Sequence, residues 1–264
     1  PPRFGYYIQD YEPDFYSPGT PEYRQAFASY TALPELALVT KTRWNADMVQ
    51  RHTGAIPTVI GASFDLDTHY PSPCANEREA DTVRILAMVR PSTPRRAPRM
   101  TMQVLKQLAD LFHKQIEITI FGVAADHPEY LKLERDFPHQ SLGELQMGEV
   151  RQLMACSDIF VDCSTFQAMG LTAMEAMASG VAVVGPVQGG LAEIIQHGHN
   201  GLLVDTSDQQ EIIKAVGQLM QDAGLRHRIR MAGLEVVTCH PLLSSGHLLD
   251  VLFPPEKDNR EEEG

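Results

Sequence analysis

The stretch STFQAMGLTAMEAMASGVAVVGPVQGGLAEIIQHGHNGLLV, residues 164–204, decides the fold of this chain of 264 residues. It reads as a loop, a helix, a buried strand, a glycine turn, a second helix and a short strand. Two polar residues, Gln167 and Glu175, lie eight positions apart across a glycine-containing loop and a helix start. Because helix N-termini attract anions, such a βα unit can hold a phosphate and hydroxyl groups together.

The same alternation of strand and helix continues on both sides of this stretch. The strands are apolar throughout, as in parallel strands that are covered on both faces. Helices between them supply right-handed crossovers, so the sequence predicts an α/β fold with a Rossmann-like, doubly wound parallel sheet. Strands are expected at Leu36–Thr40, Pro57–Ile60, Arg84–Val89, Glu117–Phe121, Asp158–Asp162 and Val181–Val184, and helices near 43–52, 99–113, 147–155, 172–179 and 208–222.

The alternation of strands and helices predicts one complete domain over residues 82–240 and only part of another over residues 1–66. The polar stretch 67–81 carries two prolines and is typical of a linker. A C-terminal helix is expected at 241–253, and the acidic tail 254–264 is expected to be disordered.

Composition narrows the choice of partners. The formal net charge of −12 argues against a general affinity for nucleic acid or anionic lipid. No apolar run approaches the ~20 residues of a membrane span, so we expect a cytoplasmic protein with at most peripheral membrane contact. The chain opens at Pro1 without a methionine, which suggests a piece of a larger parent polypeptide, and self-association through residues 1–65 is plausible.

The cysteines do not indicate a metal site or a disulfide framework. Their spacing matches no zinc pattern, and reduced thiols are expected. The four are Cys74, Cys156, Cys163 and Cys239.

Arginines cluster in the loop after the first strand of the complete domain, in the run MVRPSTPRRAPR. Loops that follow parallel strands lie at the ligand-binding edge of such a sheet. A guanidinium group can bind two phosphate oxygens at once. Because the chain is otherwise acidic, the cluster favours anion binding over a solvated basic loop.

Two interpretations of Gln167 and Glu175 stay open from the residues alone. Ser164 with Gln167, and Thr172 with Glu175, both fit the capping-box pattern of a helix start. Alternatively, free N–H groups near Gly170 hold phosphate, Glu175 accepts hydrogen bonds from a ribose, and Gln167 bonds a sugar hydroxyl.

The central stretch resembles the signature of retaining glycosyltransferases of family four, which have the architecture of two Rossmann-like domains called GT-B. Their pattern is E-G-F-G-L-P-x-L-E-A-M-A-x-G-x-P-V-V, then G-G and E-I. This chain has Q-A-M-G-L-T-A-M-E-A-M-A-S-G-V-A-V-V, then Gly189-Gly190 and Glu193-Ile194. Family members also carry G-R-L-x-x-x-K-G after the first strand, where Arg90 matches the arginine and Arg95 replaces the lysine.

The segment Tyr7–Pro13, YIQDYEP, resembles part of the acceptor domain in the rhamnosyltransferase branch of this family. The match covers residues 6–240. It implies transfer of rhamnose or a similar hexose, with retention, from a nucleoside-diphosphate sugar to a glycan acceptor in bacterial surface polysaccharide synthesis. Thymidine diphosphate is favoured as the nucleotide, and no cofactor or metal is expected.

The resemblance also implies roles for individual residues. The diphosphate would be neutralised by Arg90 and Arg95 and held by the backbone N–H groups of Met169, Gly170 and Leu171; Glu175 would bind the ribose and Gln167 the transferred sugar; and Gly189 and Gly190 would keep the backbone close to that sugar. One departure is that Gln167 stands where the family has glutamate, so it keeps hydrogen-bonding capacity but loses the charge.

Two other functions compete with the transferase. A nucleotide-binding module would bind the donor without transfer, because part of the acceptor domain is missing. A dinucleotide enzyme is disfavoured, because Met88-Val89-Arg90-Pro91 stands where a G-x-G-x-x-G motif is expected.

Overall fold

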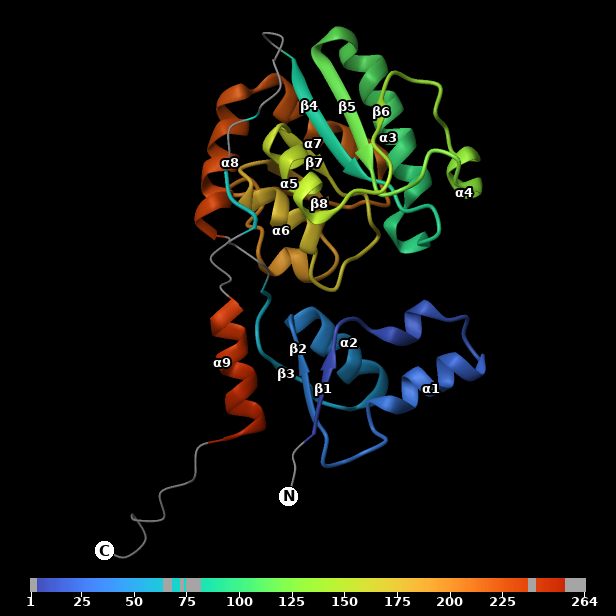
Figure 1. The fold of residues 1–264 in the computed structure, drawn as a ribbon, viewed down its shortest axis with the longest axis vertical. Helices are drawn as coiled ribbons and strands as arrows, with labels where there is room; N and C mark the ends of the chain where they lie inside the picture. Colours follow the sequence, from blue (N-terminus) through green and yellow to red (C-terminus); the bar gives the residue numbers. More distant parts are fainter. Residues whose placement is uncertain (1–3, 64–67, 72–73, 75–81, 237–240, 255–264) are drawn as a thin grey trace, which may run out of the picture. The chain divides into compact units, whose positions relative to one another are not determined.

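The computed structural model describes residues 4–63, 68–71, 74, 82–236 and 241–254. The chain divides into two compact units, which are each described by themselves (Figure 1). The first unit comprises Pro1–Ser63 with Cys239–Gly264, and the second comprises Phe64–Thr238. The division differs from the expected one at both ends of the complete domain. The expected linker falls in the second unit, and the C-terminal helix falls in the first.

The second unit is built on a six-stranded sheet in the order β6-β5-β4-β7-β8-β9, and every neighbouring pair is parallel. The chain starts in the middle, runs to one edge, returns, and then runs to the other edge, as in a doubly wound sheet. This confirms the predicted α/β fold with a parallel sheet. The strands are β4 (Val83–Met88), β5 (Ile116–Phe121), β6 (Gln140–Ser141), β7 (Ile159–Val161), β8 (Ala182–Pro186) and β9 (Leu202–Val204).

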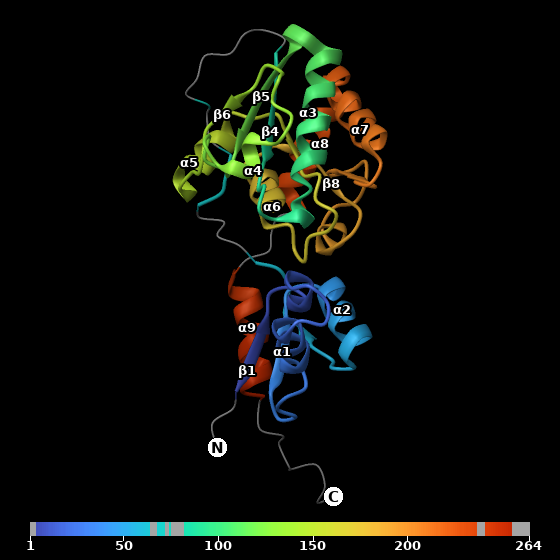
Figure 2. The same cartoon turned by 90° about the vertical axis from the view of Figure 1, so that its right-hand side faces the viewer.

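Helices cover both faces of this sheet because successive strand residues point to opposite sides. Ile85 and Ala87 of β4 join the core cluster beneath helices α3 (Pro98–Phe112) and α7 (Gln209–Gln221). The opposite face is covered by α5 (Met147–Ala155) and α6 (Leu171–Ala178), and Figure 2 shows α3 and α5 on opposite sides of the strands. The unit is completed by α4 (Pro128–Leu131), α8 (Ala223–Val236) and the short 3-10 helices η2 (Pro94–Arg96), η3 (His113–Gln115) and η4 (Gly190–Glu193).

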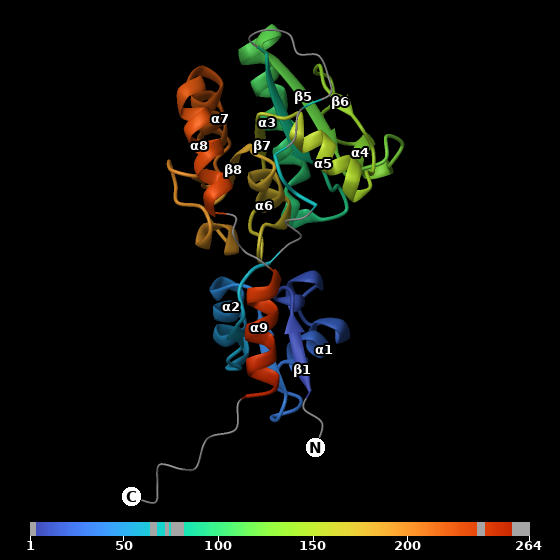
Figure 3. The same cartoon turned by 60° about the vertical axis from the view of Figure 1, so that its left-hand side comes forward.

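The first unit holds a parallel three-stranded sheet in the order β1-β2-β3. A buried polar contact joins this sheet to α2, because Asn45 Nδ2 donates to Thr40 Oγ1 at 2.8 Å. Helix α9 lies beside the sheet, where His247 Nδ1 is 3.2 Å from the Ile60 carbonyl oxygen (Figure 3). The elements are β1 (Gly5–Ile8), η1 (Glu12–Phe15), α1 (Pro21–Ser29), β2 (Ala37–Thr40), α2 (Arg43–Thr53), β3 (Thr58–Val59) and α9 (Pro241–Leu252).

Most predicted elements are found within one or two residues, but the start of the chain differs. Strand β1 and helix η1 occupy the tyrosine- and proline-rich segment, for which the sequence predicts no strand or helix. Strand β1 is stabilised by β2, which pairs with all four residues of β1. Short segments with few apolar residues carry too weak a periodic signal to be found from sequence.

The expectation of reduced thiols is wrong for two of the cysteines. Cys74 and Cys156 form a disulfide that joins the segment before β4 to the end of α5. Sequence spacing could not show this, because the two residues are 82 positions apart and meet only when the chain folds back. Cys163 is free and buried. In the described residues, no helix is long and apolar enough to cross a membrane.

We expect the disulfide to stabilise the second unit. Closing a loop of this length restricts the unfolded chain and contributes about 4 kcal/mol in the chain-entropy description. Reductant should therefore lower the midpoint of urea unfolding in the natural chain. The paired substitution Cys74→Ser with Cys156→Ser should lower it similarly and make the midpoint insensitive to reductant. An unchanged midpoint on reduction would contradict this expectation.

Candidate functional site

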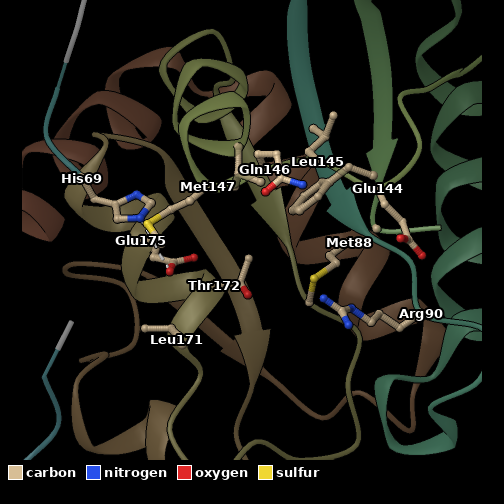
Figure 4. A pocket seen from close by; sticks show the side chains of 13 residues that line it. His69, Met88, Arg90, Glu144, Leu145, Gln146, Met147, Leu171, Thr172 and Glu175 are labelled. Atoms are coloured by element: carbon tan, nitrogen blue, oxygen red, sulfur yellow. Dashed lines mark ion pairs between the residues drawn. The ribbon is translucent and has the colours of Figure 1, made fainter. Parts of the chain in front are cut away.

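A cavity of about 410 Å³ opens at the carboxyl ends of β4 and β5 (Figure 4). Strand β4 lies at the centre of the sheet, where the chain reverses its direction of winding, and ligands bind at this point in doubly wound folds. The wall combines polar side chains with apolar ones. It is lined by His69, Met88, Arg90, Phe121, Gly122, Glu144, Leu145, Gln146, Met147, Val150, Leu171, Thr172 and Glu175.

Arg90 supplies the positive charge of this cavity. It follows β4 directly and its side chain is exposed. Figure 4 shows its guanidinium group reaching toward Thr172 at the start of α6. A permanently charged guanidinium group in this place can bind an anionic group that enters between the loop after β4 and the start of α6.

The start of α6 offers backbone donors to the same cavity. Gly170 precedes the helix with φ of +83°, and the first intrahelical bond runs from Met174 N–H to its carbonyl oxygen at 3.0 Å. The amide groups of Leu171, Thr172 and Ala173 therefore come before the first intrahelical bond, as at any helix N-terminus. The expected donors are Met169, Gly170 and Leu171, of which Gly170 is the N-cap and Leu171 is the first residue of the helix. Leu171 and Thr172 line the cavity.

Glu175 lies one turn into α6, and its side chain is 18% exposed. Burial raises the pKa of this carboxyl to about 7. The capping-box interpretation is wrong here, because Gly170 is the N-cap of the helix. The Glu175 carboxyl group contacts the imidazole of His69, because His69 Nε2 is 3.6 Å from Glu175 Oε1. The Glu175 side chain therefore lines the cavity and contacts His69 instead of capping the backbone of its own helix.

Gln167 lies in the loop after β7 and is 3% exposed. Its amide oxygen, in the orientation that satisfies its neighbours, accepts hydrogen bonds from Arg96 Nε at 3.0 Å and Arg96 Nη1 at 2.6 Å. Ser164 Oγ lies 2.7 Å from the same amide. No described helix begins between Ser164 and Gln167, so the capping-box interpretation is wrong for this residue also.

Gly189 and Gly190 hold this loop by a close backbone contact. Gly189 forms a bridge with Gln167, and Gly190 N–H donates to the Gln167 carbonyl oxygen at 2.8 Å. Gly189 has φ of +111°, and a Cβ atom there would lie 2.1 Å from that oxygen. Only glycine fits this position, and its observed partner is the protein's own backbone.

Arg95 packs beside the same loop. Its guanidinium carbon lies 5.8 Å from the centre of the Phe166 ring, and its carbonyl oxygen accepts from Thr165 N–H at 2.9 Å. Of the expected site residues, Arg90, Leu171 and Glu175 line the cavity. A separate group on the loops after β7 and β8 contains Gln167, Gly189 and Gly190, with Met169 buried next to it.

Several lining residues carry no signal in the sequence that marks them as part of a site. His69 falls in the expected linker, and Glu144 and Gln146 belong to a short segment before α5 whose one motif is a helix cap formed by Gln146 and Glu149. The rule that ligands bind at the carboxyl ends of parallel strands could have found Phe121 and Gly122, because Phe121 is the last residue of β5 and Gly122 follows it. Within the described residues, no group of three His, Cys, Asp or Glu side chains could hold a metal ion.

The switch point of this doubly wound sheet thus combines an exposed arginine, a helix N-terminus and a partly buried carboxyl group, a combination typical of α/β proteins that bind phosphorylated ligands. The family described as glycosyl transferases group 1 matches residues 75–236, which is more than half of the chain. The chain belongs to this family.

Curated relatives share part of this region. The chain is 30% identical over 138 residues to the sulfoquinovosyl transferase of Arabidopsis thaliana, covering 51% of this chain and 27% of that protein. It is 28% identical over 197 residues to an alpha-maltose-1-phosphate synthase of Mycobacterium tuberculosis, covering 66% and 50%. The chain thus spans half or less of the length of these relatives.

Solved structures confirm the GT-B type of fold. Sucrose-phosphate synthase from Thermosynechococcus elongatus matches 95% of this chain and 68% of its own, with a TM-score of 0.77 and 17% identity. HepE from Anabaena, in complex with UDP and glucose, matches 95% and 71%, with a TM-score of 0.77 and 20% identity.

The contact between Gly189 and Gln167 predicts a large penalty for a side chain. Gly189→Ala should destabilise the second unit by more than about 3 kcal/mol, because it combines a backbone clash with an unfavourable φ. The matched control is Gly198→Ala, where φ is +80° and no atom lies within 4 Å of the added Cβ. It should cost only about 1 kcal/mol. Urea unfolding of both variants measures the difference, and equal costs would contradict the close contact.

The buried carboxyl of Glu175 predicts a pH-dependent stability. The pKa is about 7 in the folded chain against an ordinary value of 4.5, so the folded chain holds this proton longer than the unfolded chain. The resulting stabilisation is complete below the ordinary value and is lost as pH rises through 7. Relative to the natural chain, Glu175→Gln should therefore gain roughly 2 kcal/mol between pH 5 and pH 8. Urea unfolding at both pH values tests this, and a constant difference would refute it.

Proposed function

We propose that this chain is the nucleotide-sugar-binding part of a glycosyltransferase, which transfers a sugar from a nucleoside diphosphate to an acceptor. The observation that carries the proposal is that Arg90, the N-terminus of α6 and Glu175 all face one cavity at the switch point of the sheet. A diphosphate needs positive charge and N–H donors, and a ribose needs a carboxylate that accepts from its hydroxyls.

In this proposal each group has one task. Arg90 neutralises the diphosphate as it leaves, while the N–H groups of Leu171 and Thr172 donate to its oxygens. Such donors are fixed before the reaction begins, so they stabilise developing charge without reorganising. Glu175 holds the ribose, and the base lies along the wall formed by Phe121 and the segment before α5. Arg95 and Gln167 would act on the diphosphate and the sugar from the neighbouring loop.

The finer part of the proposal rests on the family resemblance. We propose transfer with retention of configuration, of rhamnose or a similar hexose, to a glycan acceptor in the cytoplasm during bacterial surface polysaccharide synthesis. Thymidine diphosphate is the proposed nucleotide, and UDP, which appears in the HepE complex, is its main competitor. Turnover of TDP-rhamnose against UDP-glucose separates these two donors.

The extent of the chain supports a second candidate, a nucleotide-binding module without transfer. The chain spans half or less of its curated relatives, and transfer in this architecture requires a cleft between two domains that excludes water. On this reading the chain binds nucleotide while a longer polypeptide performs transfer. Turnover comparable to that of a complete relative would reject it.

Calorimetric titration tests the proposed site directly. We expect selective binding of one of UDP, TDP and GDP, unchanged by EDTA, and no binding of NADH. The double variant Arg90→Ala with Glu175→Ala should weaken this binding about a hundredfold, because each lost charged hydrogen bond is worth about tenfold or more. The matched control is Arg228→Ala with Glu235→Ala, two exposed α8 residues outside the cavity. Full affinity in the first double variant would refute the site.

A further inference from the structure

His69 lies in a segment that precedes β4 and belongs to no helix or strand. Its side chain is 3% exposed, yet it lines the cavity together with Glu175. The contact between Nε2 and Glu175 Oε1, at 3.6 Å, joins this segment to α6. Figure 4 shows the imidazole ring facing the carboxylate beside Met147.

The segment is held against two helices. We call residues 68–71 together with Cys74 the strap. The Tyr70 ring stacks with Arg151 of α5, whose guanidinium carbon is 4.0 Å from the ring centre. The disulfide between Cys74 and Cys156 fixes the strap to the end of the same helix. His69 is therefore presented to Glu175 by a strap that is anchored at two points on the C-terminal side of His69.

The contact with His69 restricts the Glu175 side chain, and this affects the free energy of ligand binding. A glutamate side chain has several rotatable bonds, and ordering it on binding a ligand costs free energy. The imidazole contacts Oε1 and so restricts the carboxylate before a ligand arrives. The other carboxylate oxygen, Oε2, can then accept from a ligand without first losing that freedom.

Building on the proposed function, we propose that His69 is a positioning residue for the donor nucleotide. It holds the Glu175 carboxylate in the orientation that the ribose hydroxyls require, from a strap outside the glycosyltransferase signature. The donor site accordingly comprises the strap as well as the loops at the strand ends.

The test is calorimetric titration of the full chain with UDP and TDP. His69→Phe keeps a planar ring and removes the polar contact, and it should weaken binding of the preferred nucleotide about tenfold. His69→Gln keeps a side-chain donor and should stay within about threefold of the natural chain. The control is His199→Phe, an exposed residue outside the cavity, which should leave the affinity unchanged.

A second measurement separates positioning from a general structural effect. In a Glu175→Gln background, His69→Phe should cause no further loss of affinity beyond about twofold, because His69 acts through the carboxylate. Losses that simply add in the double variant would overturn the proposal. So would natural affinity in His69→Phe, or a loss in His69→Gln as large as in His69→Phe.

The same titrations distinguish failure of the proposed donor site from failure of the proposed role of His69. If the natural chain binds none of UDP, TDP and GDP, the donor site itself is refuted and the role of His69 with it. If the natural chain binds one of them and the His69 variants bind equally well, the donor site stands and only the positioning role is refuted.

Discussion

The pairing of β4 with β7 is the constraint on which the second unit depends. These strands are adjacent in the sheet although two further strands separate them in sequence, so the chain reverses its direction of winding between them. The helices that follow, α3 and α6, leave toward opposite faces, and the loops at the carboxyl ends spread apart. The cavity at this opening is lined by polar side chains such as Arg90 and Glu175 together with apolar ones such as Met88 and Phe121.

Placing Glu175 at this opening costs hydration free energy of its carboxylate. A carboxylate that is taken out of water loses hydration, and this burial raises its pKa to about 7. His69 contacts one oxygen, but a single contact at 3.6 Å replaces only part of the lost solvation. Hydroxyl groups of a ligand would supply further hydrogen bonds to this carboxylate. The partly buried carboxylate therefore opposes the stability of the folded chain, and in the proposed function a bound ligand would offset this cost.

The sequence predicts the sheet well because the strands and helices of the second unit carry strong periodic signals. Helix α5 is found over residues 147–155 as expected, and Arg90 and Glu175 do reach one cavity. Local patterns fail where tertiary contacts decide. The capping-box pattern at Thr172 is overruled by Gly170, whose positive φ starts the helix one residue earlier than expected. The contacts of His69 and Cys74 form because the strap folds back onto α5 and α6. The spacing of residues in the sequence does not predict these contacts.

Gln167 shows how a departure from the family pattern can be compatible with an intact loop. Its amide oxygen accepts from Arg96 at a position where a carboxylate oxygen would form an ion pair with one buried partner, because Gln167 is buried and Arg96 is half-buried. Burying two charges costs hydration of both, and the amide satisfies the same donor without a second charge. The hydrogen bond that orders the loop is thus kept, along with the backbone bridge to Gly189. What changes is the charge, which is one unit more positive beside Arg95 and Arg96 than with glutamate. At the carboxyl edge of a parallel sheet, that difference favours an anionic ligand.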